Sequence, residues 1–163
     1  MVQDPNEIIF ENLDKKAQEY LSLYLHCAQT TFLTLQEQFE LDDQGSVLKA
    51  LTPFPGIALR GETCGAVIGS LMALGLVYGR GREHLDNFRS YQKSLPPARR
   101  FCRKFEEQVG STMCGDIIEA EFGERYDLAD PVQAMQWMNG GAHEKCGAVI
   151  RKGVRIAAEI ILR

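Results

Sequence analysis

Hydrophobic side chains recur every three or four residues along most of the chain, which is the period of an amphipathic helix. The first such series comprises Leu13, Ala17, Tyr20, Leu21, Tyr24, Ala28, Phe32, Leu35 and Phe39. Its spacing predicts one long helix or two stacked helices. Because apolar and polar residues alternate nowhere over a length sufficient for a strand, the whole pattern predicts an all-α fold.

The most apolar segment, residues 62–78, predicts a buried central helix in a single-domain bundle. Gly65, Gly69 and Ala73 recur every four residues within it and form a smooth face. Such a face lets another backbone or a compact cofactor approach closely. The segment is shorter than the roughly 20 apolar residues that a membrane span needs, so we expect no membrane insertion.

Turn-forming residues divide the rest of the chain into shorter predicted helices. A loop is predicted from residue 52 to residue 61, and the pair Pro96-Pro97 is predicted to separate two helices. The shorter predicted helices cover 46–51, 83–94, 97–109, 112–122, 131–137 and 142–162. A length of 163 residues favours one domain spanning 1–163.

Charge and composition exclude several classes of protein. The chain has 18 Lys and Arg against 22 Asp and Glu, and it lacks the broad positive stripe of a nucleic-acid-binding protein. Residues 1–10 lack the basic start and apolar core of a signal peptide. We therefore expect a cytoplasmic protein that binds no nucleic acid and whose cysteines are kept reduced.

Three of the five cysteines share one local sequence. Cys-Gly-Ala-Val-Ile occurs at residues 64–68 and again at 146–150, and Cys-Gly-Asp-Ile-Ile occurs at 114–118. Each copy opens, or nearly opens, a predicted helix, where the partial positive charge and free N–H groups favour the thiolate. The glycine removes a side chain where a second sulfur or a metal ion would have to fit. The pattern favours metal binding or redox chemistry over core packing.

The remaining candidates carry weaker signals. Cys102 lies inside a predicted helix and reads as a plain helical residue, and Cys27 also lacks the following glycine. His143 lies three residues before Cys146 on the same helical side, either as a ligand or proton donor or simply as part of the first helical turn. No Cys-x-x-Cys pair and no Cys-x-x-Cys-His sequence occurs, so any site must be assembled from separate helices.

Residues 61–69, Gly-Glu-Thr-Cys-Gly-Ala-Val-Ile-Gly, resemble the central motif of the C_GCAxxG_C_C family of redox-active proteins. The resemblance covers about residues 20–161. That family is similar to the cysteine-bearing part of split-Soret cytochromes, which holds an iron–sulfur cluster. The resemblance thus implies such a cluster, with the two-iron form ahead of the four-iron form, and no haem. The implied ligands are Cys27, Cys64, Cys114 and Cys146.

Four functions remain open from the sequence. The first is electron transfer or redox sensing through the iron–sulfur cluster, with a redox partner protein that the sequence does not identify. The second is a metal-free thiol–disulfide oxidoreductase with Cys64 as the nucleophile. The third is a structural zinc site of four cysteines. The fourth is a partner-binding helical domain with inert cysteines. Whether the protein is an enzyme, and whether it forms a homodimer, also stays open.

Overall fold

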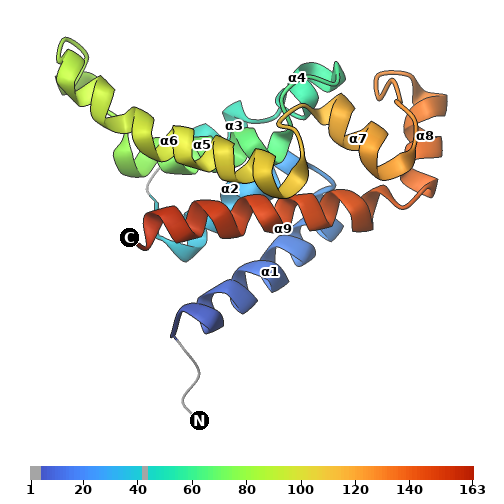
Figure 1. Cartoon of the computed structure of the whole chain (residues 1–163), viewed down its shortest axis with the longest axis horizontal. Helices are drawn as coiled ribbons and strands as arrows, with labels where there is room; N and C mark the ends of the chain where they lie inside the picture. The colour runs from blue at the N-terminus through green and yellow to red at the C-terminus, as the bar shows by residue number, and fades with distance from the viewer. Residues whose placement is uncertain (1–4, 42–43) are drawn as a thin grey trace.

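The computed structural model describes residues 5–41 and 44–163, and within them every regular element is helical. The elements in chain order are α1 (Pro5–Tyr24), α2 (Cys27–Gln38), α3 (Ser46–Ala50), α4 (Gly56–Leu59), α5 (Gly65–Tyr78), the 3-10 turn η1 (Arg82–His84), α6 (Phe88–Val109), α7 (Cys114–Phe122), α8 (Pro131–Asn139) and α9 (Ala142–Ile161). The predicted all-α fold is confirmed (Figure 1).

The core forms where α2, α5 and α9 pack together, with α1 lying along α9 and α6 contacting both α5 and α9 (Figure 1). The predicted smooth face of α5 lies against α2. A Cβ atom placed on Gly69 would lie 2.5 Å from Ala28 O and 2.9 Å from Thr31 Cβ, closer than real Cβ atoms approach their neighbours. Glycine is therefore required here for the close approach of the two helices.

Ion pairs join the outer helices to α9. Arg155 donates two hydrogen bonds to the carboxylate of Asp14 on α1, at 2.9 and 2.7 Å. Lys104 on α6 donates to Glu159 at 2.6 Å. These pairs are partly exposed, so each contributes at most about 1 kcal/mol to stability. They connect the faces of α1 and α6 that meet α9.

The first predicted helical segment forms two helices, α1 and α2. Two helices, rather than one long helix, was one of the two alternatives that the sequence left open. The break falls at Leu25, whose φ of +50° cannot continue a right-handed helix. The prediction of a buried central helix holds for the first half of α5. Its second half exposes Met72, Leu76 and Val77.

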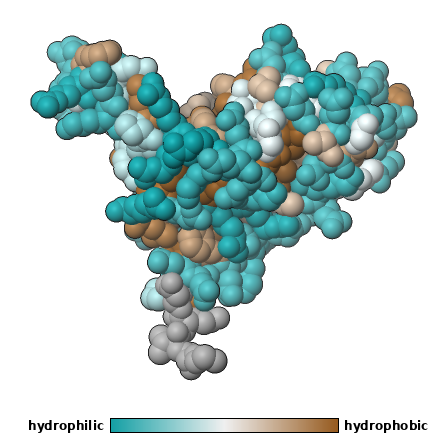
Figure 2. Space-filling model, in the orientation of Figure 1, coloured by the Kyte–Doolittle hydropathy of each residue, from teal (hydrophilic) through white to brown (hydrophobic). Residues whose placement is uncertain are grey.

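The predicted break at Pro96-Pro97 is wrong, because α6 runs unbroken from Phe88 to Val109. The two prolines lack N–H groups and leave the carbonyls of Gln92 and Lys93 without helical donors. Both of these residues are exposed, so water can meet the carbonyls. The first half of α6 extends away from the rest of the chain as an arm (Figures 1 and 2).

The predicted loop at residues 52–61 contains one left-handed turn, α4. Gly56, Ile57, Ala58 and Leu59 all have positive φ, between 49° and 63°. Left-handed backbone costs roughly 1–2 kcal/mol for each residue that carries a Cβ atom. Strain of this kind is characteristic of functional sites.

The face of the molecule in Figure 2 is mostly hydrophilic, with hydrophobic surface confined to separate patches. In the described part of the chain, no helix combines the length and the apolar character that a membrane crossing requires.

Candidate functional site

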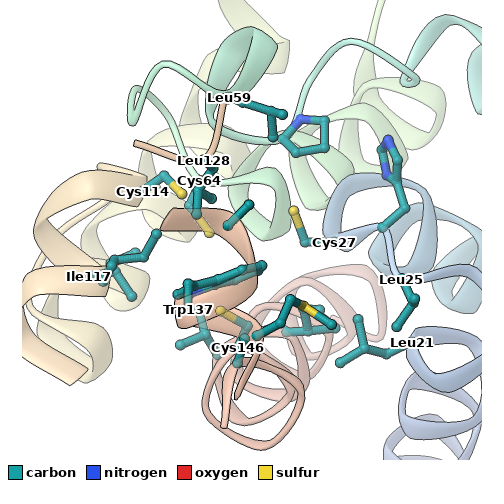
Figure 3. Close-up of a pocket in the computed structure, with 18 of the residues that line it drawn as sticks. Leu21, Leu25, Cys27, Leu59, Cys64, Cys114, Ile117, Leu128, Trp137 and Cys146 are labelled. Atoms are coloured by element: carbon teal, nitrogen blue, oxygen red, sulfur yellow. The ribbon is translucent and has the colours of Figure 1, made fainter. Parts of the chain in front are cut away.

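Four of the five cysteines line one cavity of about 560 Å³ (Figure 3). Their sulfur atoms reach it from four different parts of the helical bundle, at the starts of α2, α5 and α7 and in α9. Apolar side chains form most of the rest of the wall, and the described lining includes no Asp, Glu, Lys or Arg. The lining cysteines are Cys27, Cys64, Cys114 and Cys146.

A short antiparallel bridge holds Cys64 and Cys114 side by side. Cys64 N–H donates to Thr112 O at 2.8 Å, and Cys114 N–H donates to Glu62 O at 2.6 Å. The bridge itself pairs Thr63 with Met113. The two cysteine motifs therefore cross just before their helices begin, which brings two distant stretches of sequence into one site.

Cys27 is the first residue of α2, and the residue before it, His26, caps this helix. The His26 Nδ1 atom accepts a hydrogen bond from Gln29 N–H at 3.1 Å, which caps the helix. Since Nδ1 accepts, the ring proton lies on Nε2, which donates to Thr52 O at 3.0 Å. His26 thus ties the start of α2 to the segment that precedes α4.

Cys146 lies in the second turn of α9, so its predicted place at a helix start is only approximate. His143 stands at the cavity wall, with both ring nitrogens engaged. The hydroxyl of Ser22 donates its proton to Gln18 O, so its oxygen accepts a hydrogen bond from His143 Nε2 at 3.0 Å. The other ring nitrogen, His143 Nδ1, accepts from Gln18 Nε2 at 3.4 Å. His143 therefore joins α9 to α1 and has no nitrogen left for a metal.

Gly65 bears out the predicted reason for a glycine after the cysteine. A Cβ atom at this position would collide with Cys27 Sγ and would lie 2.9 Å from Ala28 N. The glycines at 115 and 147 have other neighbours: the nearest groups are Arg125 and Gly61 for the first, and Leu21 and Gln18 for the second. Of the three motif glycines, only the one in α5 makes room for a second sulfur.

Burial, rather than helix charge, controls the protonation of the thiols. Desolvation raises the pKa of Cys114 and of Cys146 to about 12, and the nearby Cys64 acts on both in the same direction. Desolvation also raises the pKa of Cys27 well above its ordinary value. The pKa of Cys64 is raised by burial too, although N–H groups of Ala66 and Val67 oppose the shift. Burial therefore outweighs the stabilisation of thiolates that was predicted at helix starts.

The metal-free, reduced protein should lose stability as the pH rises above about 9. Unfolded thiols ionise near 9.0, whereas Cys114 and Cys146 stay protonated to about pH 12 in the folded chain. The contribution of these two protonated thiols to the free energy of unfolding is complete below pH 9. Between pH 9 and pH 12 it declines by about 1.4 kcal/mol for each thiol and each pH unit. Urea denaturation across this range measures the slope. A variant with alanine at both positions should show a shallower slope, and an unchanged slope would contradict the assignment.

The four thiols are unpaired, and no disulfide joins any of the described cysteines. Among residues 5–41 and 44–163, no three His, Cys, Asp or Glu side chains converge on a point where one metal ion would bind. A single zinc ion needs thiolates within about 2.3 Å. The four thiols instead line a cavity of about 560 Å³, a space much larger than one ion.

The structure shows which of the candidate residues line the cavity and which do not. Cys102 is on α6, half-buried against the core, and does not line the cavity. The helix start at Cys27 was missed, because no glycine, proline or strong capping residue marks it. Trp137 was missed as a cavity residue. The pair Asp130-Pro131 does predict the start of its helix, but nothing in the sequence says which way that helix faces.

The sequence profile of one protein family matches residues 25–160, and its description is "Putative redox-active protein (C_GCAxxG_C_C)". The match covers most of the chain and all four cavity cysteines. The protein therefore belongs to the C_GCAxxG_C_C family, a class of redox-active proteins. Neither a curated protein nor a solved structure matches the chain.

Proposed function

We propose that this protein transfers electrons or senses redox state through an iron–sulfur cluster bound by four thiolates. The ligands would be Cys27, Cys64, Cys114 and Cys146. The observation that carries the proposal is that these four thiols meet at one cavity with no charged side chain in its described lining. Four cysteines are the usual ligand set for two-iron and four-iron clusters, of which we favour the two-iron form.

The protein's own contribution would be to hold the sulfurs, exclude water and set the electrostatics. Desolvation, and after it repulsion from the neighbouring thiolates, raises the pKa of Cys27 and of Cys146, so ionising all four thiols in this cavity costs free energy. A cationic metal core would offset that cost and allow the protons to leave. When bound, such a cluster accepts and releases single electrons. The N–H groups of Ala66 and Val67 near Cys64 would stabilise the more negative, reduced state.

A second candidate is thiol–disulfide exchange without metal. It is favoured by the close approach of the Cys27 sulfur to the start of α5, where Cys64 is the capping residue. Two cavity thiols would form an S–S bond and pass two electrons and two protons to the disulfide of a partner protein. The raised pKa of Cys64 weighs against this candidate, because the attacking species is the thiolate.

Counting electrons distinguishes the two candidates. Protein treated with iron and sulfide without oxygen is then mildly oxidised and titrated with reductant, while visible absorbance and free thiols are followed. The cluster proposal predicts uptake of single electrons with bleaching and no new thiols. Uptake of two electrons with the appearance of two thiols would favour the dithiol candidate and contradict the cluster. The Cys102→Ser variant serves as the matched protein, since its remaining thiols all belong to the cavity.

A further inference from the structure

The first half of α6 and the turn before it, residues 80–100, form a basic arm on an acidic protein. The arm carries six Lys or Arg against two Asp or Glu, whereas the rest of the chain carries twelve against twenty. It extends away from the packed helices, and its tip shows both hydrophilic and hydrophobic surface (Figures 1 and 2). Positive charge is therefore concentrated on a part of the molecule that projects from the body.

No carboxylate neutralises the cations of the arm. In the part of the chain that the structure describes, every Lys or Arg that forms an ion pair lies outside the arm. The guanidinium of Arg80 is used within the arm, where it donates to Leu85 O at 2.7 Å and to Asn87 O at 3.2 Å. The cations of the arm that face solvent are Arg82, Arg89, Lys93 and Arg99.

The tip of the arm also exposes large apolar side chains. Leu85 is 59% exposed, Phe88 is 65% exposed and Tyr91 is 41% exposed. The rings of Phe88 and Tyr91 lie 5.8 Å apart, and the guanidinium of Arg80 lies 5.2 Å from the centre of the Tyr91 ring. Apolar groups gathered in this way next to cations indicate a contact surface.

The helix places the two kinds of side chain on adjacent faces. Phe88 and Tyr91 are three residues apart on one face, and Arg89 and Lys93 are four residues apart on the face beside it. Asn87 caps the helix by accepting a backbone N–H of the first turn at 3.1 Å. The arm is thus ordered before it meets a partner, which lowers the entropic cost of binding.

We infer that this arm binds the surface of a membrane that contains anionic lipids. An amphipathic helix with aromatic and aliphatic residues on one face and Lys or Arg beside them lies in the interface between headgroups and acyl chains. The cations would contact the headgroups and the apolar side chains would enter the interface, with no helix crossing the bilayer. A projecting arm suits a flat surface, because the acidic body stays away from the lipid. This inference does not depend on the cluster.

Vesicle binding without added iron tests the inference. Wild-type protein should sediment with vesicles of equal parts phosphatidylcholine and phosphatidylserine, less so as salt is raised, and hardly with phosphatidylcholine alone. Each cation near such a surface contributes about fivefold, so Arg89→Gln with Lys93→Gln should lower binding about thirtyfold. Lys15→Gln with Lys49→Gln is the control, because it removes the same charge from exposed positions on α1 and α3 and should bind as the wild type does.

Phe88→Ser separates a lipid surface from other acidic partners. The ring is mostly exposed, so the fold should persist by circular dichroism, while vesicle binding should fall about tenfold as the ring no longer leaves water. Unchanged binding in this variant would show attraction of charges alone, as an acidic protein or a nucleic acid would also give, and would overturn the inference.

Three further results would overturn the inference. The first is a wild type that does not bind the anionic vesicles, or that binds the neutral ones equally well. The second is an equal loss of binding in the two double variants. The third is a wild type that ignores vesicles but forms a dimer in sedimentation velocity, which Arg89→Gln with Lys93→Gln dissociates. That last result would assign the arm to a second copy of the chain.

Discussion

Replacing Cys64 with serine is expected to abolish the loading of iron and sulfide while leaving the helical fold in place. Serine offers a hard oxygen that stays protonated, whereas iron in such clusters is held by soft thiolates. Mutating a residue that only supports a metal ligand typically lowers metal affinity about tenfold to a hundredfold. Removing a ligand itself should therefore lower the affinity at least as much. Metal content after reconstitution, with circular dichroism as the check on folding, measures the effect.

The other three cavity cysteines should behave in the same way, and Cys102 provides the control. Cys102→Ser removes a thiol of the same chain that does not line the cavity, so its iron and sulfide content should equal that of the wild type. Equal loading in the Cys64 and Cys102 variants would show that the cavity thiols hold no cluster. The single variants to compare are Cys27→Ser, Cys114→Ser and Cys146→Ser.

Gly65→Ala is expected to destabilise the protein and to disrupt the site. The added methyl group would collide with Cys27 Sγ and press on the backbone of Ala28. Overpacking of a close contact costs about 1–3 kcal/mol, enough to exceed the gain of roughly 0.5–1 kcal/mol that alanine brings inside a helix. The change should therefore lower the free energy of unfolding in urea and also displace the Cys27 thiol.

Gly75→Ala supplies the matched control for that change. Gly75 lies on the same helix, and a Cβ atom there would have no neighbour within 4 Å. This substitution should leave stability unchanged or raise it by up to about 1 kcal/mol, with normal iron loading. If Gly65→Ala were as stable as Gly75→Ala and loaded as much iron, the close approach of α5 to the Cys27 sulfur would not matter to the site.

The elements with local signals were predictable from the sequence. The period of apolar residues marks the main helices, and the repeated Cys-Gly motif marks Cys64, Cys114 and Cys146 as one set of candidates. Local sequence can do so because helix periods and stop signals act within a few residues. The resemblance of residues 61–69 to a family motif then adds Cys27 as a fourth candidate, which local sequence alone does not select.

Features that depend on distant parts of the chain were not predictable. The continuity of α6 through Pro96 is tolerated because the residues whose carbonyls lose their donors are exposed, and exposure is a property of the assembled fold. The raised pKa of the thiols follows from burial by four helices, which reverses the effect expected from helix starts alone. The place of Trp137 in the cavity wall follows from the packing of α8, which the local sequence does not reveal.

The most direct test of the account is chemical analysis of protein purified without oxygen. Visible absorption, iron, acid-labile sulfide and zinc are measured on the same sample, before and after reconstitution with iron and sulfide. The account predicts broad visible absorption with iron and sulfide in matching amounts, and little zinc. A colourless protein that contains no iron, and that stays so after reconstitution, would contradict an iron–sulfur cluster in the cysteine cavity.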